Sequence, residues 1–124
     1  LVAEWVAKAE EDFLTVEILA RQRGKRIHNS VCFHAQQCAE KYLKALLVSH
    51  KLPTRKTHDL GELADALRSS EPTIALIEDL FDGLTPHAVE SRYPGDDATA
   101  HEAKAARRTV KEIRRFSRSR LKLS

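Results

Sequence analysis

The sequence has few of the residues that interrupt helices or build strands. Its 124 residues include four glycines, four prolines, one tryptophan and no methionine. Alanine and leucine are frequent, and β-branched residues do not alternate with polar ones, which favours helices over strands. No apolar run approaches the roughly 18 residues of a membrane-spanning helix, and the first residues lack the layout of a signal peptide. We therefore expect an all-α protein that has no membrane span.

Cysteine is also scarce, with only Cys32 and Cys38, six positions apart. On one helix their side chains point in different directions and cannot form a disulfide. They are either small reduced core residues or redox or metal ligands, and their place beside an apolar helix face favours the first interpretation. The histidines have no zinc spacing, and phosphate-loop, HExxH and GxSxG motifs are missing. We expect no metal, no cofactor and a reducing, cytoplasmic setting.

The length predicts a single domain over residues 1–124, large enough to bury its own core. Apolar residues recur at helical spacing in five segments, which are residues 2–23, 30–51, 59–68, 73–84 and 98–120. Asn29 or Ser30 is the expected start of the second helix, and Asp96, Asp97 or Thr99 the expected cap of the fifth. Short connections between these segments predict an antiparallel up-and-down bundle of four to five helices.

The second predicted helix combines a very broad apolar face with a narrow polar one. Its apolar residues cover more than half of the circumference, which is typical of the central helix of a bundle. Three polar residues, His34, Gln37 and Lys41, share the remaining face, with Lys44 nearby. This polar row is either the solvated side of the helix or one wall of a binding site.

Two further groups of residues offer phosphate or base contacts. His58 precedes the third predicted helix, where it either caps a turn or acts in acid–base chemistry. Arg92 and Tyr93 lie in the long irregular segment 85–97. They either close one end of the bundle or bind phosphate and stack on a base.

The last predicted helix is strongly basic. Between residues 104 and 122 there are nine lysines and arginines and one acid, Glu112. One face carries Lys104, Arg107, Lys111, Arg114 and Arg118. With few acids to neutralise it, this face is either a solvated surface or a contact for nucleic acid or another acidic partner.

Four sequence segments together resemble a known family. They are AEEDFLTVEILA (residues 9–20), FHAQQCAEKYLKALL (33–47), THDL (57–60) and SRYP (91–94). In this order, and over nearly the whole chain, they resemble the HEPN family, the higher eukaryotes and prokaryotes nucleotide-binding domain. The resemblance implies a bundle of four or five helices that forms a homodimer. It also implies a toxin–antitoxin pairing with a minimal nucleotidyltransferase.

In the ribonuclease branch of that family, an Arg-x(4–6)-His motif forms a metal-independent active site at the dimer interface. Here eight residues separate Arg92 from His101. The pair Arg23 and His28 has four residues between, but it lies in the first interhelical turn. The motif is therefore not found at the expected place.

Several polar residues of this chain match recurring polar positions of the family, and the resemblance implies a nucleotide- or RNA-binding site there. It comprises His34, Lys41, His58, Asp59, Arg92 and Tyr93, to which the polar row adds Gln37. Arg92 would hold phosphate, Tyr93 would stack, and Lys41 would add charge. One alternative is a metal-independent ribonuclease in which Arg92 acts with His101 or His58. The other is a non-catalytic dimeric interaction module.

Overall fold

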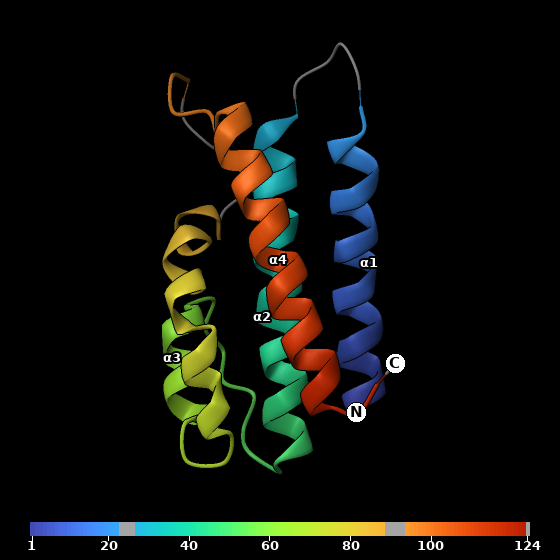
Figure 1. The fold of residues 1–124 in the computed structure, drawn as a ribbon, viewed down its shortest axis with the longest axis vertical. Coiled ribbons are helices and arrows are strands. Elements are labelled where there is room, and N and C mark those ends of the chain that lie inside the picture. Colours follow the sequence, from blue (N-terminus) through green and yellow to red (C-terminus); the bar gives the residue numbers. More distant parts are fainter. Residues whose placement is uncertain (23–26, 89–93, 124) are drawn as a thin grey trace.

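The structure of the protein is a computed structural model, which describes residues 1–22, 27–88 and 94–123. Within these ranges there are four α-helices, three short 3₁₀ helices and no strand (Figure 1). The α-helices are α1 (Val2–Ala20), α2 (His28–Ser49), α3 (Leu60–Leu67) and α4 (Ala100–Arg120). The 3₁₀ helices are η1 (Pro72–Leu76), η2 (Glu78–Gly83) and η3 (Thr85–His87). The predicted all-α bundle is confirmed.

Helix α2 is the central element, as its broad apolar face predicts. It packs against α1, α3 and α4. The side chains of Tyr42, Leu43, Leu46 and Leu47 are completely buried. Burying each such leucine contributes roughly 1.5–3 kcal/mol to folding, so enclosure of α2 supplies much of the driving force for the bundle.

The long passes of the chain alternate in direction, so that α2 and α4 run parallel to each other (Figure 1). Near the start of α2, the Asn29 side chain donates to Asp97 (2.9 Å) and accepts the Ala98 backbone N–H (2.7 Å). Asn29 is thus not the helix cap that was expected, because α2 already begins at His28 and the Asn29 amide instead ties α2 to the segment before α4. Residues 72–87 run antiparallel to both α2 and α4 (Figure 1).

At the opposite end of the bundle, the buried carboxylate of Glu71 joins α2 to α4. It lies 3.1 Å from His50 Nε2, just after α2, and accepts a 2.6 Å hydrogen bond from Arg120 Nε at the end of α4. Thr73 donates a third hydrogen bond (2.9 Å). Burial alone would raise the pKa of Glu71, but these hydrogen bonds hold the pKa below its ordinary value.

Side-chain caps define the starts of α3 and α4. Asp59 accepts the backbone N–H groups of Gly61 (2.8 Å) and Glu62 (3.4 Å). Thr99, one of the three caps expected for the last helix, forms a reciprocal capping box with Glu102.

The segment predicted as a fourth regular helix, residues 73–84, is instead built from 3₁₀ turns. The buried side chains of this segment are spaced three or four residues apart. They are Ile74, Ile77, Phe81 and Leu84, and buried His87 follows three residues later. A 3₁₀ helix has three residues per turn and therefore keeps such a narrow spacing on one face. Backbone bonds such as Ile77 N–H to Ile74 O (3.1 Å) follow that pattern.

Cys32 and Cys38 are not joined in a disulfide, and both are fully buried in the core. Burial raises the pKa of the Cys38 thiol, so it stays protonated and unreactive. Cys32 and Cys38 therefore act as small core residues.

We expect Glu71→Gln to lower the free energy of unfolding at pH 7 by about 1–3 kcal/mol, because charged hydrogen bonds to His50 and Arg120 are weakened. The folded-state pKa of Glu71 lies below its ordinary value of 4.5. Its contribution is therefore complete above that pH and is lost as the pH falls through the folded-state pKa. Urea unfolding at several pH values measures the difference between wild type and variant, which should shrink below about pH 4.5.

Asp82→Asn is the matched control, since Asp82 is an exposed carboxylate on η2. An equal loss of stability in the two variants, or a difference that does not depend on pH, would contradict this role of Glu71.

Candidate functional site

The polar row of α2 lies against a buried carboxylate of α1. His34 Nδ1 is 2.9 Å from Asp12 Oδ1, and Lys41 Nζ donates to Asp12 Oδ2 at 2.5 Å. The Asp12 side chain is 10% exposed, whereas those of His34 and Lys41 are 26% and 24% exposed. Because a carboxylate only accepts, Nδ1 of His34 carries the proton and donates it. Asp12 therefore fixes both side chains, and the contact to His34 uses Nδ1 rather than Nε2.

A second buried carboxylate, Glu40, organises the neighbouring part of α2. Its Oε1 atom lies 2.9 Å from His58 Nδ1, and its Oε2 atom accepts a 3.0 Å hydrogen bond from Lys44. The Glu40 side chain is 5% exposed, and that of His58 is 70% exposed. Lys44 Nζ also lies 5.6 Å from the centre of the Trp5 ring. The His58 imidazole is thus held by its inner nitrogen and turned toward solvent.

Two glutamines connect this second cluster to the polar row. Gln36 is fully buried and donates to the backbone oxygen of His58 at 2.9 Å. Gln37 in turn donates to the Gln36 side-chain oxygen at 2.8 Å. The structure therefore places His34 and Lys41 on one hydrogen-bonded cluster, around Asp12, and Gln37 and His58 on a second, around Gln36 and Glu40. We call these four residues the α2 polar face.

The remaining predicted site residues are not joined to this face by any interaction recorded in the described ranges. Asp59 is used as the N-cap of α3. His101 is exposed in the first turn of α4. Arg92 and Tyr93 lie outside the described residues.

The profile of the HEPN domain family matches residues 2–120, which is nearly the whole chain. The chain belongs to the HEPN domain family. No curated protein and no solved structure gives a match. Membership connects the chain with nucleotide and RNA biochemistry at the level of the family. Every helix in the described part is too short or too polar to cross a bilayer.

The basic face of α4 in this HEPN chain is neutralised more than the sequence suggests. Glu17 of α1 accepts two hydrogen bonds from Arg107 (3.0 and 2.7 Å) and lies 4.0 Å from Lys111. Glu10, also on α1, is paired in the same way with Arg114 and is 3.8 Å from Arg118. The expectation that few acids oppose the face is wrong, because the acids come from α1 rather than from α4.

These pairs are charge-assisted and lower the pKa of both glutamates. Hydrogen bonds from Arg107 hold the pKa of Glu17 below its ordinary value, and those from Arg114 do the same for Glu10. Lys104, in contrast, is exposed and has no ion pair recorded within the described ranges. The face therefore splits into cations that dock α4 on α1 and cations that face solvent.

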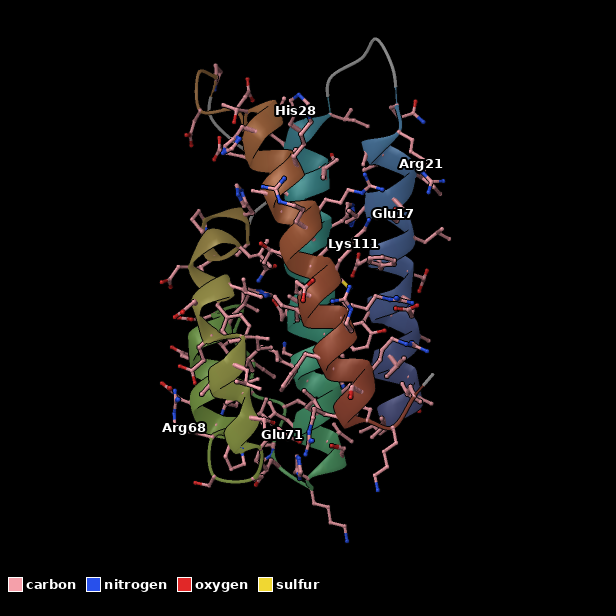
Figure 2. All side chains as sticks on the ribbon, in the orientation of Figure 1. Glu17, Arg21, His28, Arg68, Glu71 and Lys111 are labelled. Atoms are coloured by element: carbon pink, nitrogen blue, oxygen red, sulfur yellow. The ribbon has the colours of Figure 1, made fainter. Side chains whose placement is uncertain are left out.

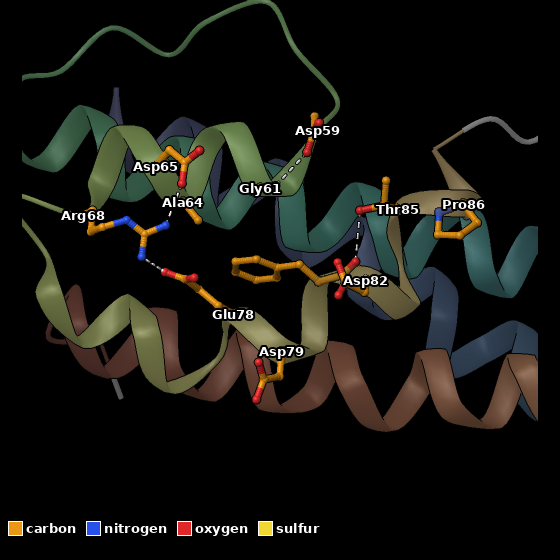
Figure 3. Close-up of a pocket in the computed structure, with 11 residues that line it drawn as sticks. Asp59, Gly61, Ala64, Asp65, Arg68, Glu78, Asp79, Asp82, Thr85 and Pro86 are labelled. Atoms are coloured by element: carbon orange, nitrogen blue, oxygen red, sulfur yellow. Dashed lines mark hydrogen bonds and ion pairs between the residues drawn. The ribbon is translucent and has the colours of Figure 1, made fainter.

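A hollow of about 560 Å³ between α3 and η2 has the opposite charge (Figure 3). Its single cation, Arg68, is paired with Asp65 (2.6 Å) and Glu78. The other charged lining residues are Asp59, Asp79 and Asp82. A phosphate would be repelled there, and the described residues contain no group of three ligands that could hold a metal ion.

Sequence reasoning missed Gln36 and Glu40, the two buried polar residues that hold Gln37 and His58 of the α2 polar face. Both fall among apolar residues of α2, four positions apart. A polar pair at that spacing on an otherwise apolar face is a signal that buried hydrogen bonding is needed. Their partner His58 is 18 residues away from Glu40, so helical periodicity alone does not reveal it.

We expect Asp12→Ala to destabilise the HEPN fold by about 1–3 kcal/mol, because Lys41 and His34 lose their acceptor at a partly buried site. Urea unfolding measures the loss, and nitrogen chemical shifts of the His34 ring should report a changed tautomer. Glu11→Ala is the control: its exposed side chain is 3.7 Å from Lys8, and such surface pairs contribute about 0–1 kcal/mol. Similar losses in both variants, with unchanged His34 shifts, would refute the anchoring role.

Proposed function

We propose that this HEPN chain binds a nucleotide or RNA phosphate at the α2 polar face. The observation that carries the proposal is the pairing of His34 and Lys41 with one buried carboxylate, Asp12. Fixing two phosphate-binding groups side by side before the ligand arrives reduces the ordering cost of binding. A simple solvated helix face does not need such an anchor.

The chemistry of the face suits an anion with several oxygen atoms. The ammonium of Lys41 has three donors, and one of them is used by Asp12. His34 offers Nε2, and Gln37 adds an amide at the intervening turn of α2. Asp12 offsets the charge of Lys41, so we expect recognition by directed hydrogen bonds more than by strong net charge.

Nucleotide titrations test this site. We expect wild-type protein to bind ATP or AMP measurably by calorimetry, and the double variant His34→Ala, Lys41→Ala to bind at least about tenfold more weakly, since each hydrogen bond to a charged group is worth roughly 1.5–3 kcal/mol. Lys51→Ala removes an exposed lysine just beyond α2 and is the control. Equal affinities of wild type and the double variant would rule out this face as the site.

A metal-independent ribonuclease is the second candidate function, and the pairing of His58 with Glu40 favours it. A carboxylate that accepts a hydrogen bond from Nδ1 fixes the tautomer and orientation of an imidazole, as in the histidine of a catalytic triad. His58 is held in this way, whereas His101 has no such partner recorded in the described ranges. His58 is therefore the better supported of the two histidines.

We expect any RNA cleavage by the pure protein to continue in EDTA, to be lost in His58→Ala and to persist in His101→Ala. General acid–base catalysis contributes typically 10²–10⁴-fold, so loss of His58 should lower the rate by about that factor. Electrophoresis of labelled RNA measures the rates. Absence of cleavage by wild-type protein, or an equal effect of both substitutions, would exclude this mechanism.

The proposal extends to the partners and setting implied by family membership. We infer a single cytoplasmic domain that forms a homodimer and acts as the toxin-type component beside a minimal nucleotidyltransferase. Membership of the HEPN family supports this part, and two buried cysteines that are not joined in a disulfide are compatible with a reducing compartment. Light scattering tests the dimer, and co-purification with a nucleotidyltransferase encoded beside it tests the pairing.

A further inference from the structure

A second feature lies on the other flank of α1, between α1 and the C-terminal half of α4. It is a groove of about 570 Å³, lined by Phe13, Lys111, Arg114, Arg115, Arg118, Ser119 and Leu123. Four of these residues are cations, and none is an acid. Figure 2 shows Lys111 on the side of α4 that faces α1, beside Glu17. We call this the α1–α4 groove.

The groove is separate from the α2 polar face. Glu10, which pairs with the groove residue Arg114, is two positions from Asp12, which pairs with His34. At about 100° per residue these two carboxylates point roughly 200° apart around α1. One small ligand therefore cannot occupy both places.

The guanidinium of Arg114 is fixed in the wall of the groove. Its Nε and Nη2 atoms donate to Glu10 at 2.7 and 2.8 Å, and its centre lies 4.4 Å from the middle of the Phe13 ring. Glu10 is held in turn by a hydrogen bond from the Tyr42 hydroxyl. Burial, together with that bond, raises the pKa of Tyr42 to about 12, so the hydroxyl remains a donor at neutral pH.

Among the described residues, the acids beside the groove are shared by a larger number of cations. Glu10 serves both Arg114 and Arg118. Glu17 is already bound by two nitrogens of Arg107 and is only a distant partner for Lys111. The Arg115 side chain is 74% exposed, and its recorded partner in the described part of the chain is Glu112, three residues earlier on the same helix. The groove therefore keeps a surplus of positive charge.

We propose that the α1–α4 groove binds the phosphodiester backbone of single-stranded RNA. The choice of RNA as ligand rests on the proposed function. The groove itself is an additional site that takes successive phosphates rather than a single nucleotide. Residues 111 and 118 are roughly 10 Å apart along the α4 axis at about 1.5 Å per residue. A row of cations of that length fits a chain of phosphates better than one phosphate group.

The apolar part of the lining favours RNA over a membrane surface. Only Phe13 and Leu123 are large apolar residues in the groove. Binding to a bilayer surface requires a broad apolar helix face, which α4 lacks. Single-stranded nucleic acid needs only a cationic track with an occasional aromatic side chain.

The double variant Lys111→Glu, Arg115→Glu tests the groove with little risk to folding, because both side chains are exposed. With a fluorescein-labelled oligouridylate as probe, we expect roughly tenfold weaker binding at low salt. The slope of log K against log salt should fall by about 0.7 for each lost phosphate contact. Fluorescence anisotropy at several salt concentrations measures both quantities, and thermal unfolding confirms that the variant is folded.

The matched control is Lys104→Glu, Arg108→Glu, which makes the same charge change at exposed positions of α4 outside the groove. Equal weakening by both double variants would refute the groove as the RNA-binding site, because the general positive charge of α4 would then explain binding. No weakening by Lys111→Glu, Arg115→Glu would also overturn it. Equal or tighter binding of wild-type protein to phosphatidylserine vesicles, again dependent on Lys111 and Arg115, would replace RNA by a membrane as the ligand and so overturn the proposal.

The same variants separate this inference from the proposed function. The groove variant should bind AMP as wild type does, and the variant His34→Ala, Lys41→Ala should retain the salt-dependent binding of RNA in the groove. If wild-type protein binds AMP at the α2 polar face but binds no RNA, the groove proposal is refuted and the proposed nucleotide site is not. RNA binding that needs Lys111 and Arg115, without any nucleotide binding that needs His34, would support the groove and refute the proposed nucleotide site.

Discussion

The bundle depends on one constraint: α2 is enclosed by its neighbours yet carries polar residues, and buried polar groups must find partners inside the protein. Three carboxylates meet this requirement. Asp12 reaches α2 from α1, Glu40 lies on α2 itself, and Glu71 joins the ends of α2 and α4. Each of them holds a histidine and a cation. The apolar core supplies the bulk of the stability, while these carboxylates specify how the elements align.

The same constraint explains why charge is distributed so unevenly along the chain. The acids of α1 and the cations of α4 are about 90 to 104 positions apart in the sequence, and they meet only when the two helices pack on α2. Part of the basic helix is thereby used to dock it. What remains exposed is a narrower cationic surface, and the α1–α4 groove is part of it. A basic sequence segment is therefore not equivalent to a basic surface.

Much of the fold follows from periodicity. The four α-helices, the central position of α2 and the Thr99 cap were all predictable, because each depends on residues within one or two helical turns. The region 73–84 was not, since its apolar residues fit both a regular helix and a series of 3₁₀ turns. Packing on α2 and α4 decides between the two. The role of Asn29 was also missed, because its partners Asp97 and Ala98 lie about 70 residues away.

For the candidate site, helical periodicity is enough to place His34, Gln37 and Lys41 on one face of a central helix, and the sequence motifs are enough to reveal the resemblance to the HEPN family. Helix geometry and local spacing are sufficient for this. The three-dimensional packing reveals that Asp12 anchors two of these residues and that Glu40 orients His58. It alone showed that Glu10 and Glu17 neutralise part of the basic helix. These pairings join distant parts of the chain, and the registers of packed helices set them, which no local pattern encodes.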